Sequence, residues 1–159
     1  MWERLRRFSA IDADARGIFL RATAVLPVIS VSLKMRGFGA TQEFLLRSLP
    51  VVRQASQEKS IDTACDLKRT ELTSRMVNAA IRHVWRASTC LEKSLALWWL
   101  LRRQGIASQL RIGARKVNDK FEAHAWVERD GAALNEPQQE HRHYATFDAA
   151  FPLHRSETL

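Results

Sequence analysis

The thiol of Cys90 stands at the start of an apolar helical run, residues 90–101, directly after the polar residues Ser88 and Thr89. Either hydroxyl can cap a helix N-terminus by accepting a backbone hydrogen bond. Free N–H groups and the positive end of the helix dipole favour a thiolate in the first turn. Because the thiolate is the reactive form of cysteine, this position predicts a catalytic nucleophile. The alternative is a buried cysteine that acts as a small hydrophobe.

A histidine follows in an element of a different kind. His124 lies within residues 121–128, where apolar and aromatic side chains alternate with polar ones as in a β-strand. A cysteine on a helix followed by a histidine on a strand is the order used by papain-like and transglutaminase-like enzymes. An imidazole within hydrogen-bond reach would serve as the base that activates the thiol. The alternative is a strand histidine with a structural role alone.

The third group, which would orient the imidazole, depends on the register of a predicted hairpin. A three-residue loop over 129–131 places Glu136 opposite His124, whereas a two-residue Asp-Gly loop places Asn135 diagonally from it. A slip of one residue in the pairing moves every side chain of the strand to the opposite face of the sheet. The turn residues alone are compatible with both registers. We take the three-residue loop and Glu136 as the hypothesis. Trp126 and Asn135 are then candidate substrate contacts, with a core position as the alternative for Trp126.

The elements that must hold these residues follow from the hydropathy pattern. A period near 3.6 predicts helices over 11–33, 42–49, 62–85 and 90–105, the second capped by Thr41 and the last ended by Gly105. A period of two then predicts strands over 109–114, 122–128 and 132–136. The fold class is therefore α+β, with a small antiparallel sheet packed on the cysteine-bearing helix.

Length and charge limit the organisation. The 159 residues predict a single domain over 1–159, with a helical portion at about 1–60 and a catalytic core at about 61–150. The chain has 25 Lys and Arg against 17 Asp and Glu, and this excess falls within residues 1–105. Such a surface could attract nucleic acid, anionic lipid or an acidic peptide, with an ordinary solvated basic surface as the alternative, and no nucleic-acid-binding motif is present.

Cysteine usage and hydropathy indicate the compartment. Two cysteines, Cys65 and Cys90, make no disulfide framework, which predicts a reducing cytoplasm. The apolar run over 22–33 is shorter than a bilayer span and contains Pro27, so we expect a buried helix and no membrane insertion. No histidine or cysteine has a partner at metal-ligand spacing, so neither a metal nor a cofactor is expected.

Several segments together resemble a known family. They are Cys-Leu-x-x-Ser-Leu-Ala-Leu from Cys90, Leu-Leu-Arg-Arg-x-Gly-Ile from Leu100, Leu-x-Ile-Gly-x-Arg-Lys from Leu110, and Phe-x-Ala-His-Ala-Trp-Val-Glu from Phe121. The sequence resembles the transglutaminase-like B proteins of lasso-peptide biosynthesis, of the stand-alone type, mainly over residues 85–136. The resemblance implies a papain/transglutaminase-like fold.

The resemblance also implies a function and partners. It implies a cysteine peptidase that removes the leader from a ribosomally made precursor peptide and frees the core amine for macrolactam formation. Cys90 matches the nucleophile, His124 the base, and Glu136 the position that is usually Asp. The implied partners are the precursor leader, a separate leader-recognition protein and a lasso cyclase. The alternatives are an acyltransferase or transglutaminase on the same triad, and a non-catalytic basic binding module.

Overall fold

The computed structural model describes residues 12–49, 63–85, 88–135 and 143–146. Within these residues, helices come first and a four-stranded antiparallel sheet follows. The elements are α2 (Ala13–Arg47), α3 (Thr63–His83), α4 (Cys90–Arg103), β1 (Gln109–Val117), β2 (Lys120–Arg129), β3 (Ala132–Ala133) and β4 (Ala145–Thr146). The order of strands in the sheet is β3-β2-β1-β4. The predicted α+β class is confirmed.

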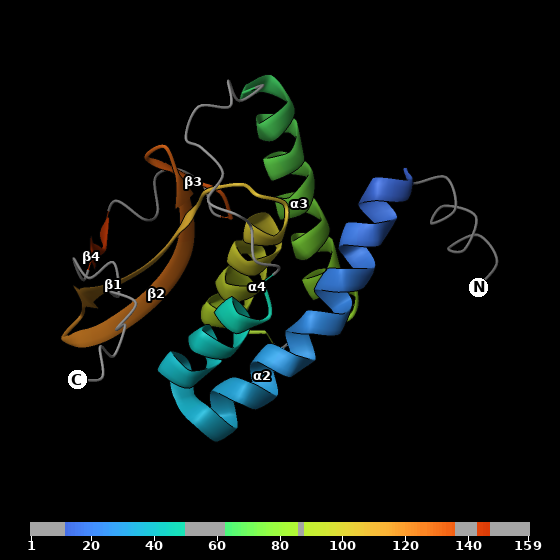
Figure 1. Cartoon of the computed structure of the whole chain (residues 1–159). Coiled ribbons are helices and arrows are strands. Elements are labelled where there is room, and N and C mark those ends of the chain that lie inside the picture. The colour runs from blue at the N-terminus through green and yellow to red at the C-terminus, as the bar shows by residue number, and fades with distance from the viewer. Residues whose placement is uncertain (1–11, 50–62, 86–87, 136–142, 147–159) are drawn as a thin grey trace, which may run out of the picture.

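Helix α4 forms the centre of the molecule. Figure 1 shows it between the sheet on one side and the pair α2 and α3 on the other. Its middle turns are apolar on nearly every side, so each neighbouring element covers part of them. Fully buried residues of α4 include Leu95, Leu97 and Leu101, which belong to the same core cluster as Ile29 of α2 and Val127 of β2.

Both ends of α4 lie where the sequence predicts them. Thr89 is the N-cap: its hydroxyl accepts from the Glu92 N–H at 3.3 Å, and the Glu92 carboxylate accepts from the Thr89 N–H at 2.7 Å. This reciprocal pair is a capping box. At the other end Gly105 has φ 76°, and the N–H groups of Gly105 and Ile106 donate to the carbonyls of Arg102 and Leu101. These two bonds make a Schellman ending, which favours glycine at that position.

The range of α2 contains two helical limbs, as predicted by the separate helices over 11–33 and 42–49, and the limbs meet at a sharp break. The break falls at Gly37, with φ 76° and ψ −176°, and helical structure continues on both sides of it. The prediction that Thr41 caps a second helix is wrong. The Thr41 hydroxyl instead donates to the Gly37 carbonyl at 2.7 Å and lies 2.9 Å from the Ser32 hydroxyl. These contacts tie the second limb of α2 to the first across the bend.

The burial of α2 corrects a second expectation. One face packs in the core through residues such as Ala22 and Ile29, but an apolar stripe that includes Leu20, Val31 and Met35 is exposed. The expectation of a buried helix therefore holds for one face only. The argument that the apolar run is too short for a bilayer is also wrong, because α2 has the length and composition of a span. A core helix or a signal sequence near the N-terminus meets the same criterion.

Two tight turns set the register of the sheet. Asn118 and Asp119 join β1 to β2, and Asp130 and Gly131 join β2 to β3; all four residues have positive φ. Two-residue loops of this kind match the right-handed twist of the strands that they connect. Arg129 pairs with Ala132 and Glu128 with Ala133. The hypothesis of a three-residue loop over 129–131 is therefore wrong.

Candidate active site

Cys90 is the first residue of α4 and its side chain is half-buried. The capping box holds the chain that enters the helix at Thr89, so the thiol lies in the first turn, as the sequence predicts. The first N–H groups of a helix have no partner within it and point toward this end. Cys65, by contrast, lies exposed near the start of α3. Of the two cysteines, Cys90 is therefore the half-buried one and the one that opens a capped helix.

Three buried hydrogen bonds join α4 to the edge of β2. The Ser94 hydroxyl donates to the Ala125 carbonyl at 2.8 Å. The Asn135 amide donates to the Ser94 hydroxyl at 2.9 Å and accepts from the Val127 N–H at 2.9 Å. Strand β3 ends at Ala133, so these backbone groups of β2 lie beyond its last residue. The two side chains thus take the place of a longer neighbouring strand.

This connection, the Ser94–Asn135 bridge, joins the helix that carries Cys90 to the strand that carries His124. Ser94 lies one helical turn after Cys90, a rise of about 6 Å along the axis. Ala125, which receives the Ser94 hydrogen bond, directly follows His124. The first turns of α4 and the middle of β2 therefore meet, with the thiol on one element and the imidazole on the other.

The bridge also defines what Asn135 does. Asn135 is 6% exposed, and its amide engages Ser94 and Val127. Its carbonyl accepts a hydrogen bond from the Lys93 ammonium at 2.8 Å. Both side-chain atoms thus hold the helix against the strand, a role that sequence reasoning missed. Glu136, the predicted third member of the triad, lies outside the described residues.

Replacing Asn135 with alanine is expected to lower the free energy of unfolding by about 1–3 kcal/mol, because the Val127 N–H would stay buried without its acceptor. Urea unfolding measures this loss. In a double-mutant cycle with Ser94→Ala, the two changes should be strongly non-additive, because both break the same bridge. Additive losses, or a loss from Asn135→Ala within about 0.5 kcal/mol of zero, would show that the bridge contributes little.

Aromatic rings enclose His124 on its face of β2. The ring of Trp126 is stacked on the same face with its centroid 6.1 Å away, and that of Tyr144 is tilted at 5.1 Å. Trp126 is 1% exposed and the His124 Nε2 atom is shielded from solvent. Gly113 of β1 lies directly opposite His124 in the register. The half-buried imidazole therefore lies in an aromatic cluster, on a strand where it alternates with Val127, the residue that packs in the core with α4.

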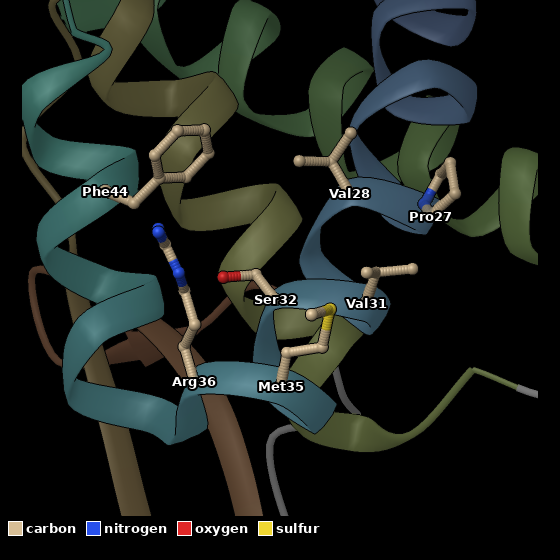
Figure 2. A pocket seen from close by; sticks show the side chains of 7 residues that line it. All are labelled: Pro27, Val28, Val31, Ser32, Met35, Arg36 and Phe44. Atoms are coloured by element: carbon tan, nitrogen blue, oxygen red, sulfur yellow. The ribbon is translucent and has the colours of Figure 1, made fainter.

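An apolar groove lies elsewhere, between the two limbs of α2. It has a volume of about 440 Å³ and is lined by Pro27, Val28, Val31, Ser32, Met35, Arg36 and Phe44. Figure 2 shows Phe44 on one limb and Val28 on the other, with the side chain of Arg36 rising between them. None of the predicted site residues lines this groove. The apolar run over 22–33, which the sequence predicts to be buried, supplies four of the residues that line this groove.

The candidate site thus consists of a thiol at a capped helix N-terminus and a histidine on a strand of the small antiparallel sheet that this helix contacts. The sequence model of the transglutaminase-like superfamily (Transglut_core3) matches residues 26–147, more than half of the chain. The chain belongs to the transglutaminase-like superfamily, as the sequence resemblance predicted at this level. Comparisons with curated proteins and with solved structures returned no match.

Proposed function

We propose that this protein is a cytoplasmic cysteine peptidase that removes the leader from a ribosomally made lasso precursor peptide. The observation that carries the proposal is the Ser94–Asn135 bridge, which brings the helix N-terminus of Cys90 to the strand of His124. Membership of the transglutaminase-like superfamily, whose members usually use a Cys-His-acid triad, supports this kind of chemistry. The lasso precursor as substrate, and the cytoplasm as location, come from the sequence resemblance and the cysteine content.

In the proposed reaction, the His124 imidazole takes the proton of the Cys90 thiol, and the thiolate attacks the carbonyl at the leader–core junction. The backbone N–H of Cys90 points toward the helix N-terminus and would stabilise the oxyanion. His124 then donates its proton to the departing core amine as the C–N bond breaks. Water, deprotonated by His124, hydrolyses the thioester and releases the leader with a free carboxylate.

We keep Glu136 as the proposed group that orients His124. Its support is the family resemblance, because the hairpin register that nominated it does not form. Glutamate is one methylene longer than the usual aspartate, so the backbone at position 136 would lie farther from the imidazole than an aspartate backbone would. The buried bridge leaves Asn135 to hold the helix, which argues against a Cys-His-Asn arrangement.

The superfamily name favours one second candidate, transfer of the acyl group from the thioester to an amine. Hydrolysis yields two peptides whose masses sum to the precursor plus one water, whereas transfer yields a joined product. The test mixes the protein with a candidate precursor and its leader-recognition protein and follows the products by mass spectrometry. A joined peptide in place of free leader and core would assign the transferase activity instead.

The proposed peptidase is expected to depend on a separate leader-recognition protein. The chain carries a net charge of +8, so an acidic partner would associate faster at low salt. A partner that delivers the leader raises the substrate concentration near Cys90, which should lower the apparent KM about tenfold or more and change kcat little.

Cleavage rates against precursor concentration, with and without the partner at two salt concentrations, measure this dependence. If the isolated chain cleaves the full precursor just as fast, and the partner changes nothing, leader recognition resides in this chain.

A further inference from the structure

Tyr144 covers the imidazole of His124 from a neighbouring element. It directly precedes β4, which pairs with β1 on the side of the sheet away from β3. Its ring centroid lies 5.1 Å from that of His124 and 6.4 Å from that of Trp126. The three rings thus form one cluster in which the imidazole has an aromatic neighbour on its own strand and another from across the sheet.

The position of Tyr144 requires a glycine on β1. A Cβ atom on Gly113 would lie 2.9 Å from the Tyr144 Cβ, 3.0 Å from the Ala145 carbonyl oxygen and 3.1 Å from the Trp126 Cη2. Two of these atoms belong to the chain at the start of β4 and the third to a fully buried ring, so none can move cheaply. Because Gly113 pairs directly with His124, the missing side chain leaves the space that the aromatic cluster fills.

A charged pair on β1 and β2 also contacts the ring of Tyr144. The guanidinium of Arg115 lies 4.6 Å from the Tyr144 ring centroid, within the range of a cation–π contact. The same guanidinium donates to the Glu122 carboxylate at 2.8 Å, which fixes it on the adjacent strand. The Tyr144 ring therefore contacts both the Arg115 guanidinium and the His124 imidazole.

We propose that Tyr144 is a positioning residue, which acts through His124 by fixing the imidazole for proton exchange with Cys90, in the space that Gly113 provides. This inference rests on the proposed function. An imidazole can rotate about two side-chain bonds, and small misplacements of a base reduce proton transfer steeply. Ring packing restricts this rotation without any bond to the tyrosine hydroxyl.

The test uses the full chain in a Cys65→Ala background, so that Cys90 is the one remaining thiol. The probe is iodoacetamide, and the rate of Cys90 alkylation near neutral pH is followed by mass spectrometry. Tyr144→Ala is expected to slow alkylation roughly tenfold, because a freely rotating imidazole draws the thiol proton less often. Tyr144→Phe keeps the ring and should alkylate at the parent rate.

Precursor cleavage gives a second readout, in which Tyr144→Ala should lower kcat and leave KM nearly unchanged, as expected when orientation rather than binding is lost. Thermal unfolding shows whether the Tyr144→Ala variant is folded. If it is not, Tyr144→Leu replaces it in the test, because leucine keeps much of the apolar volume but has no ring. Phe121→Ala is the matched control, because this ring is on the same strand but 81% exposed, and it should behave as the parent.

His124→Ala separates failure of this inference from failure of the proposed function. If His124→Ala alkylates as fast as the parent, the Cys90–His124 pair itself is wrong. If His124→Ala is slow but Tyr144→Ala and Tyr144→Leu both match the parent, the pair stands and the role of Tyr144 is overturned. A slow Tyr144→Phe would also overturn it, since the hydroxyl rather than the ring would then be responsible.

Discussion

Replacing Cys90 with alanine is expected to lower leader cleavage by a factor of roughly 10⁴ to 10⁶ while the protein stays folded. Without the thiol no thioester can form, and water would have to attack the peptide bond directly. The fold should survive because Cys90 is half-buried at the first position of α4, where alanine fits the helix and the Thr89 cap is unchanged. Precursor cleavage by mass spectrometry and helix content by circular dichroism measure the two effects.

Cys65 provides the matched control for this experiment. It is the other cysteine of the chain, and it is exposed near the start of α3. Cys65→Ala should therefore cleave the precursor at close to the wild-type rate. If Cys90→Ala still cleaves within tenfold of wild type, the nucleophile is another group and the proposed mechanism fails.

The parts of the fold that the sequence predicts well are those determined by nearby residues. The ends of α4 follow from Thr89 and Gly105, which satisfy free backbone groups of the same helix within a few positions. The break within α2 likewise falls between the predicted helices over 11–33 and 42–49, at Gly37, which adopts the positive φ. Local chemistry of this kind is independent of what packs against the helix.

The register of β3 and the role of Asn135 depend on distant contacts instead. Turn residues allowed two hairpin loops, and the observed one is stabilised by side-chain bonds to Ser94, 41 positions earlier in the chain. No periodicity in the sequence indicates that an amide will replace a strand. The sequence did not predict the cluster of Tyr144 with His124 for the same reason. The cluster depends on the space beside Gly113, and in the sequence Gly113 is only a small residue within a strand pattern.

Replacing His124 with alanine should lower kcat for leader cleavage by about 10² to 10⁴-fold, because the thiol loses the base that activates it and the amine loses its proton donor. Apparent KM should change little, since the precursor is held mainly through its leader in the proposed reaction. Stability should fall only modestly, because the Ser94–Asn135 bridge does not use the imidazole. Initial rates at saturating precursor, together with urea unfolding, measure both quantities.

His83→Ala is the matched control, because that histidine lies exposed at the end of α3. The alanine at position 124 would also leave a space between the rings of Trp126 and Tyr144, into which free imidazole can diffuse. Added imidazole should then restore part of the lost rate to His124→Ala and none to Cys90→Ala, since only the former lacks a base. Cleavage by His124→Ala within threefold of wild type, without imidazole, would exclude His124 as the base and require another proton acceptor beside Cys90.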